Sequence, residues 1–212
     1  MTEPMTMLTD YVLCLLALAF GYVTLRKNKV DGSISRSLWA CAFLSLSLGA
    51  LAGGTWHGFQ WQEGFRDSLW KTTTLSMGFT SLFMTGSVVF ANCSGKSRRN
   101  WLIVAGIKFL LYAGLSTISD DFRIVIADYG SAMLVILTIA LAQTLRKSRP
   151  EAPWLATGIT VSLIASGIQA SGISLHEHLN HNDLFHLVQM PALYLFLRGG
   201  ILLQDRESIS AP

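Results

Sequence analysis

Charged residues are scarce in this chain of 212 residues: Asp, Glu, Lys and Arg make up 14%, whereas hydrophobic residues make up 51%. The mean hydropathy is +0.44, which lies outside the range of soluble proteins. The net charge is only +3, and no cluster of basic residues is typical of a nucleic-acid-binding surface. The composition therefore indicates a membrane protein and argues against a nucleic-acid partner.

Cysteine is scarce as well, with three residues in the whole chain: Cys14, Cys41 and Cys93. Two of them lie inside apolar runs, no CxxC pair occurs, and the count is odd. This pattern indicates neither a disulfide framework nor a zinc–thiolate site. The sequence also lacks low-complexity tracts and any connector long enough to hold a soluble domain.

Long apolar runs separated by short charged clusters make up most of the chain. Runs of about 18 to 24 residues are long enough to cross roughly 30 Å of hydrocarbon at about 1.5 Å per residue. Seven such runs are present, at approximately residues 8–25, 37–59, 68–91, 101–118, 123–144, 153–174 and 183–203. We therefore predict one all-α domain over residues 1–212, a bundle of seven transmembrane helices.

Basic residues alternate between the connectors and predict the orientation of the bundle. Lys and Arg favour cytoplasmic loops, and they gather in the connectors 26–36, 92–100 and 145–152, whereas the opposite connectors contain only Arg66 and Arg123. This places the N-terminus outside and the C-terminus in the cytoplasm. No basic segment of a secretory signal precedes the first run, which we expect to be a retained helix in a bacterial cytoplasmic (inner) membrane.

Ionisable residues occur near the outer ends of four predicted helices, where their desolvation is costly. At about 1.5 Å per residue, each lies within some 10 Å of the outer boundary. They are interpreted either as interfacial anchors in an aromatic belt or as the walls of one buried site. Their convergence on one layer favours the site. The members of this layer are His57, Lys71, Asp128, Asp183 and His186.

The seventh run opens with closely spaced polar residues. Asp183 and Asn182 lie three and four positions before His186, so both share a helix face with it. Asn182 is a candidate N-cap, which would leave His181 in the preceding loop and free to bend toward His186. His57 and His186, with either His181 or Asp183, could then supply three ligands for a catalytic zinc ion.

Two other features flank this motif. Pro191 removes a backbone donor and is expected to bend the seventh helix beneath His186, although prolines are also ordinary in transmembrane helices. The preceding loop contains His176, Glu177 and His178. A His-rich exposed loop is more often solvated than part of a catalytic centre.

Glycines recur at four-residue spacing in the second run, as Gly49 with Gly53 and Gly54 with Gly58. Small residues at this spacing allow helices to approach closely. The approach could hold a side chain of this run against a neighbouring helix, or it could join two copies of the chain in a homo-oligomer.

With these features together, the sequence resembles the CREST superfamily of seven-helix membrane metallohydrolases, which includes alkaline ceramidases and the progestin and adiponectin receptors. Its members hold zinc with one His of the second helix and a His-x-x-x-His pair on the seventh. They also have a Ser four residues before the first His and an Asp near the third helix. His57 matches the second-helix ligand, and His186 matches the second member of the pair.

The chain departs from this pattern at two positions. Asn182 stands where the family has the first His of the pair, with His181 as a candidate substitute, and Gly53 stands where the family has Ser. Asp67 lies approximately where an alkaline ceramidase has its Asp. The resemblance covers nearly the whole chain in layout and only part of the motifs, which makes this a divergent, bacterial-type relative.

The resemblance implies a zinc-dependent hydrolase that cleaves a lipid amide or ester near the outer face, with a membrane lipid as its substrate. Zinc would activate a water molecule and polarise the scissile carbonyl, while Asp67 or Asp183 accepts the proton. Lys71 or Thr55 would stabilise the developing oxyanion.

Two alternatives stay open. In the first, the chain is a non-enzymatic, receptor-like or structural protein, and the polar layer with Asn182 is a hydrogen-bonded network. In the second, it is a small-solute or proton carrier that uses Lys71, Asp128 and His186. Lys108 lies closer to the membrane centre and could snorkel inward or pair with a carboxylate such as Asp128. The absence of an evident inverted repeat weighs against the carrier.

Overall fold

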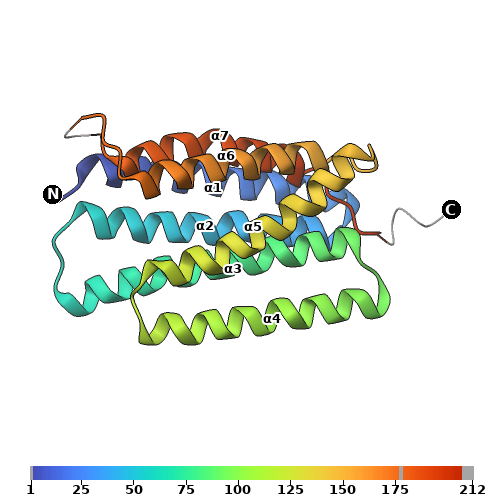
Figure 1. The fold of residues 1–212 in the computed structure, drawn as a ribbon, viewed down its shortest axis with the longest axis horizontal. Helices are drawn as coiled ribbons and strands as arrows, with labels where there is room; N and C mark the ends of the chain where they lie inside the picture. The colour runs from blue at the N-terminus through green and yellow to red at the C-terminus, as the bar shows by residue number, and fades with distance from the viewer. Residues whose placement is uncertain (1, 177–178, 207–212) are drawn as a thin grey trace.

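The computed structural model describes residues 2–176 and 179–206, and the described residues form seven α-helices that run side by side along the long axis of the molecule (Figure 1). The helices are α1 (Pro4–Asp31), α2 (Ile34–Gly58), α3 (Glu63–Asn92), α4 (Gly95–Ile118), α5 (Phe122–Leu145), α6 (Ala152–Ser171) and α7 (His181–Gly200). The prediction of seven helices in an all-α bundle is therefore confirmed.

Six of these helices, α1 to α6, are long and apolar enough to cross a membrane. This supports the interpretation of the chain as a membrane protein. Among the described residues, α7 is not one of the six, because its first half is rich in polar side chains. It nevertheless packs along both α1 and α6. The seventh predicted span is thus confirmed as a helix, and its crossing of the membrane stays a prediction.

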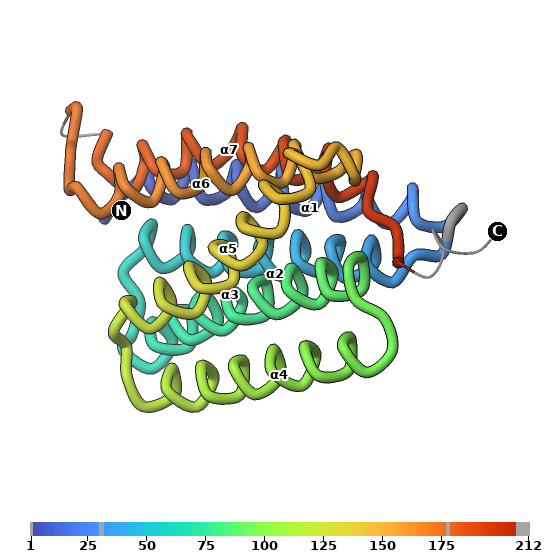
Figure 2. The backbone as a smooth tube through the Cα atoms, turned by 45° about the vertical axis from the view of Figure 1, so that its right-hand side comes forward, coloured from blue at the N-terminus to red at the C-terminus, as the bar shows by residue number. Residues whose placement is uncertain are grey.

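Six of the helices form a closed ring of neighbours, in the order α1, α2, α3, α5, α6 and α7, and α4 lies outside this ring. α2 packs between α1 and α3, α7 packs on α1 and α6, and α5 packs on α3 and α6. α4 lies at one edge of the bundle, where it packs chiefly on α3 and more sparsely on α5 (Figure 2). The sparse α4–α5 contact leaves a groove that is described below.

Local capping explains where α7 begins. The side chain of Asn180 accepts hydrogen bonds from the backbone N–H groups of Asn182 and Asp183, and Asp183 accepts one from the N–H of Asn180. This reciprocal capping box makes Asn180 the N-cap. The prediction that Asn182 caps the helix is therefore wrong, and His181 is the first helical residue instead of a loop residue. Five positions before His186, it lies on a different helix face.

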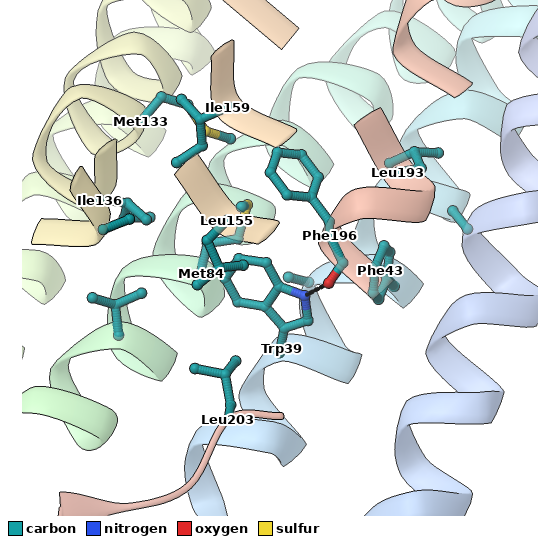
Figure 3. Close-up of a cluster of buried hydrophobic side chains, with 14 of the residues drawn as sticks. Trp39, Phe43, Met84, Met133, Ile136, Leu155, Ile159, Leu193, Phe196 and Leu203 are labelled. Atoms are coloured by element: carbon teal, nitrogen blue, oxygen red, sulfur yellow. Dashed lines mark hydrogen bonds between the residues drawn. The ribbon is translucent and has the colours of Figure 1, made fainter. Parts of the chain in front are cut away.

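A cluster of buried apolar side chains from α1, α2, α3, α5, α6 and α7 forms the core of the bundle (Figure 3). Trp39 of α2 is 1% exposed, and its Nε1 donates a hydrogen bond to the carbonyl oxygen of Phe196 at 3.0 Å. The two rings pack edge to face, with centroids 6.0 Å apart. A Cβ at Gly200 would lie 2.2 Å from Trp39 Cδ1, so this glycine permits the close approach. The core fixes the second half of α7 against α2.

The glycines of α2 allow close contacts with its neighbours inside the chain. Cβ atoms built at Gly54 and Gly58 would lie within 3.0 Å of side chains of α1, and one built at Gly49 would lie 3.2 Å from Ser76 of α3. Close helix approach at these glycines is thus confirmed. The homo-oligomer that they could also support stays a prediction.

Candidate functional site

A group of ionisable side chains, most of them buried, lies at the end of the bundle where α1 and α7 begin and α2 ends. They come from the first turns of α1 with its N-cap, the last turn of α2 and the first turns of α7. We call this group the acidic cluster; its members are Glu3, Asp10, His57, Asp183 and His186.

His186 joins α7 to α1 through both of its ring nitrogens. Its Nδ1 lies 2.8 Å from Thr9 Oγ1, and its Nε2 lies 3.3 Å from Asp10 Oδ1. His186 and Asp10 are each 7% exposed. Thr9 Oγ1 also lies within hydrogen-bond distance of the carbonyl oxygens of Met5 and Thr6. The imidazole therefore sits between a hydroxyl group and a carboxyl group, away from solvent.

His57 makes the corresponding contact at the more exposed edge of the cluster. Its Nδ1 lies 3.1 Å from Glu3 Oε2, and the backbone N–H of Glu3 donates to the carbonyl oxygen of His57 at 3.1 Å. Thr6 Oγ1 donates to the same Glu3 oxygen at 3.2 Å. Glu3 is 42% exposed and His57 is 19% exposed, so this pair forms the rim of the cluster.

Asp183 links the two histidine pairs. It is 1% exposed, and its Oδ2 accepts the backbone N–H of Asn180 at 2.8 Å. Its Oδ1 is buried and has no hydrogen-bond partner among the described residues. Asp183 is close enough to Asp10 and His57 to interact electrostatically with both. The capping box holds this carboxyl group rigidly at the centre of the cluster.

The cluster contains more acid than base. It has three carboxyl groups and two imidazoles, and the contacts described above include no lysine or arginine. Buried carboxylates without a cation are costly, because neither water nor an opposite charge compensates for their desolvation. The arrangement is therefore stable when it holds additional protons or a bound cation.

The structure brings only part of the predicted layer together. His57, Asp183 and His186 meet in the acidic cluster, whereas Lys71 and Asp128 do not. The prediction that four helices converge on one site is therefore wrong. Lys71 of α3 and Asp128 of α5 both face α4 instead of α1 and α7.

Lys71 and Asp128 belong to ion pairs among α3, α4 and α5. Lys71 Nζ lies 2.6 Å from Asp120 Oδ1 and donates to the carbonyl oxygen of Ser116 at 2.7 Å. Lys108 Nζ lies 2.8 Å from Asp128 Oδ1, which confirms the predicted pairing of these two side chains. We call these two contacts the α3–α5 ion pairs, because their members lie on α3, α4, α5 and the connector between α4 and α5.

The other predicted site residues are dispersed. Asp67 is exposed on α3, His181 is half-buried at the start of α7, and the Oδ1 of Asn182 accepts a hydrogen bond from Gln169 of α6 at 3.0 Å. Thr55 Oγ1 lies 3.1 Å from the hydroxyl of Tyr11. Of the His-rich loop, His176 is exposed, and residues 177 and 178 lie outside the described residues.

The cluster does not fit the zinc centre that the CREST resemblance implies. Within residues 2–176 and 179–206, no group of three or more His, Cys, Asp or Glu side chains has an arrangement that could hold a metal ion. Both ring nitrogens of His186 already face protein oxygens, and His181 lies on another face of α7. These side chains form pairwise acid–base contacts.

Sequence reasoning missed Glu3 and Asp10 as members of the site. Asp10 lies within the first apolar run, and an ionisable residue inside a spanning segment is itself a signal of function. Thr6 and Asp10 lie four positions apart, which places them on one helix face once the helix begins at Pro4. Because the first apolar run was expected to begin at residue 8, this face of the helix was not recognised.

The chain belongs to DUF6962, a family of unknown function whose model matches residues 5–205. The matched segment contains four of the five members of the acidic cluster and leaves out Glu3. No curated protein matches the chain, and no solved structure matches it.

Proposed function

We propose that this member of DUF6962 is a proton-responsive membrane protein in which the acidic cluster takes up and releases a proton from the extracytoplasmic side. The observation that carries the proposal is the placement of His186 between Thr9 and Asp10, beside the buried carboxyl group of Asp183. Histidine is the side chain whose charge changes most readily near physiological pH.

The geometry of His186 accommodates two protonation states without a change of partner. With one ring proton, Nε2–H donates to the Asp10 carboxylate and Nδ1 accepts from the Thr9 hydroxyl. With a second ring proton, Nδ1–H donates to Thr9 Oγ1, and the threonine hydroxyl turns to the carbonyl oxygen of Met5 or Thr6, at 3.1 and 3.0 Å. One proton can therefore enter or leave while every donor stays satisfied.

A proton also matches the excess of acid in the cluster. Each proton that binds neutralises one buried negative charge and lowers the desolvation cost of the cluster. The groove of about 780 Å³ in this structure lies between α4 and α5 and is lined by none of the cluster residues. The cluster thus supports a very small ligand better than a bulky substrate.

Uptake of a proton is expected to alter how α1 packs on α7, because His186 of α7 contacts both Thr9 and Asp10 of α1 directly. Protonation of either group changes the strength of that contact. The proposal therefore assigns a signalling or coupling role to the cluster, with the α1–α7 interface as the element that responds.

Infrared difference spectroscopy on membranes reconstituted with purified protein tests this proposal. Titration of the wild type is expected to change the C=O stretching band of a buried carboxyl group and the ring bands of one histidine. Asp10→Asn should remove the carboxyl change, and His186→Gln should remove the ring change. The matched control is Asp67→Asn, because Asp67 is exposed and outside the cluster. Wild-type protein without a buried carboxyl band, or Asp10→Asn with an unchanged band, would overturn the proposal.

A zinc-dependent lipid hydrolase is the second candidate. The observation in its favour is that His57 and His186, the two positions matched to zinc ligands, meet in one cluster with carboxyl groups. Metal analysis of purified protein separates the candidates. Stoichiometric zinc that is lost in both His57→Ala and His186→Ala, together with cleavage of a lipid amide, would favour the hydrolase. Metal-free protein that keeps its proton titration would favour the proton-responsive function.

A further inference from the structure

A groove of about 780 Å³ separates α4 from α5. Its walls are mostly apolar and include Val104, Ile107, Leu111, Leu115 and Ala127. Ile107 and Leu111 are 53% and 64% exposed, so the apolar wall is continuous with the open surface of α4. In a membrane, the groove therefore opens sideways toward lipid.

The groove is long enough to hold an extended alkyl chain. On α4 it extends from Val104 to Leu115, which corresponds to about 16 Å at about 1.5 Å per residue. This is roughly half of the hydrocarbon thickness of a bilayer. Arg123 and Asp121 line it at the end where α5 begins. A chain that enters along the groove would thus reach from one membrane surface to the middle.

Polar groups line the groove at the depth of Lys108 and Asp128. Lys108 is 33% exposed, whereas the Asp128 side chain is 6% exposed. Lys108 Nζ contacts Asp128 Oδ1 at 2.8 Å, the carbonyl oxygen of Asp128 at 2.6 Å and Ser81 Oγ at 3.1 Å. Its three protons are therefore all engaged. A partly exposed ion pair at this depth is costly when only hydrocarbon covers it.

At this depth, one hydrogen-bond acceptor among the described residues has no donor. Ser131 and Tyr112, which also line the groove, donate their hydroxyl protons to the carbonyl oxygens of Asp128 and Thr74. Asp128 Oδ2 has no hydrogen-bond partner among the described residues. Because the terminal torsion of an aspartate is broad, a small turn of the carboxylate presents this oxygen to a donor in the groove.

We propose that the α4–α5 groove binds an uncharged single-chain amphiphile whose hydroxyl group donates a hydrogen bond to Asp128. The ion pair with Lys108 balances the carboxylate charge, so a neutral ligand leaves the net charge of the groove at zero. The hydroxyl supplies the donor that Asp128 Oδ2 lacks, and the alkyl chain lies against the apolar walls of α4 and α5. This site is separate from the acidic cluster and does not depend on the proton-responsive function.

Photolabelling of the full chain in phosphatidylcholine nanodiscs tests the proposal. The probe is a long-chain primary alcohol with a diazirine in its alkyl chain, and labelled peptides are identified by mass spectrometry. Labels are expected on α4 and α5. An unlabelled alcohol of equal length should compete roughly tenfold better than its methyl ether, because the ether cannot donate to the buried acceptor. Equal competition by the alcohol and the ether would show that the groove binds alkyl chains without recognising the hydroxyl group, and would overturn the proposal.

Two variants of neighbouring residues provide the matched comparison. Ala127→Phe fills the groove without replacing either member of the ion pair and should abolish labelling of α4 and α5. Ile126→Phe places the same side chain one position earlier, at a residue that is 58% exposed and does not line the groove, and should keep the labelling. Equal labelling of both variants contradicts the proposal. Ala127→Phe should retain the infrared titration of the acidic cluster, so the two proposals fail independently.

Discussion

The two groups of charged side chains in this bundle differ in how their charges are balanced. In the α3–α5 ion pairs, Lys71 faces Asp120 and Lys108 faces Asp128, so each acid has its own base. In the acidic cluster, Asp10 and Asp183 lie among histidines and a third acid, with no lysine or arginine in their described contacts. In the ion pairs, a base of the same chain compensates for the charge of each acid. In the acidic cluster, part of the negative charge is compensated only when an additional proton or a cation binds.

This difference separates a structural role from a responsive one. A paired charge holds its partner in place and loses little by staying ionised. A buried acid without a cationic partner can be either neutral or charged, and its surroundings stabilise these two states to different extents. Substitutions should therefore act in opposite ways in the two groups: removal of a base destabilises the pairs, whereas neutralisation of an acid in the cluster relieves repulsion.

The largest expected effect comes from Lys108→Met. This change leaves the buried carboxylate of Asp128 without its partner and should lower the free energy of unfolding by about 3–5 kcal/mol. Denaturant unfolding of the purified protein in detergent measures it. The double variant Lys108→Met with Asp128→Leu removes both charges and should recover most of the loss. A double variant as unstable as the single one would show that the pair acts by shape alone.

Gly54→Ala should break the acidic cluster through packing instead of charge. A Cβ at Gly54 would lie 2.9 Å from Asp10 Cβ and from the Tyr11 ring, so α1 must shift away from α2. Overpacking of this kind costs about 1–3 kcal/mol. Thermal unfolding measures the cost, and the infrared titration should change as well because Asp10 moves. Gly106→Ala on α4 is the control, since nothing lies within 4 Å of its added Cβ. Similar destabilisation by both changes would contradict this account of Gly54.

The helices themselves were predictable because apolar length and helical propensity act locally. The seven expected runs match the seven helices, and the main differences occur at their ends, where first turns such as residues 4–7 extend the helix beyond the expected run. The pairing of Lys108 with Asp128 was among the possibilities that the sequence offered, because a long lysine side chain can reach a carboxylate on a neighbouring segment. Sequence gives depth well because each residue adds about 1.5 Å along the axis.

The composition of the site was less predictable because depth does not determine which neighbour a side chain faces. Lys71 and His57 were placed in one layer, yet Lys71 turns toward α4 and His57 toward the start of α1. The capping of α7 was legible in principle: Asn180 precedes Asp183 by three positions, which is the spacing of a capping box. Two nearby asparagines competed for the same role, and only packing against α1 and α6 decides between them.

Asp205→Asn tests a carboxylate that the backbone satisfies, in contrast to Asp183. Asp205 accepts the backbone N–H groups of Ile34 and Ser35 at 2.9 and 2.8 Å, at the start of α2. Partial burial raises the pKa of Asp205, but these hydrogen bonds outweigh it and hold the pKa below its ordinary value. Asp205→Asn replaces one of the two acceptor oxygens by an NH₂ group, so it should cost about 0.5–1.5 kcal/mol at neutral pH, as the loss of one hydrogen bond does.

The same carboxylate predicts a pH dependence with a definite sign. A group whose pKa is lower in the folded state adds stability above its unfolded pKa, about 3.9 for Asp, and loses that contribution as pH falls through the folded value. The difference in melting temperature between wild type and Asp205→Asn should thus be full at pH 7 and shrink below about pH 4. A difference that is constant with pH would mean that Asp205 acts without its charge.

Lys71→Met should have the smallest effect, although its ion pair is as short as that of Lys108. Asp120 is 70% exposed, so water solvates the carboxylate when the lysine is removed, and the loss should be at most about 1 kcal/mol. Added salt should weaken the wild-type contribution of this pair and leave that of the Lys108–Asp128 pair largely unchanged. Chemical unfolding at low and high salt measures both. If Lys71→Met lowered the free energy of unfolding as much as Lys108→Met, burial would not determine the strength of these pairs. Burial would then also give no reason to regard the carboxyl groups of the acidic cluster as costly.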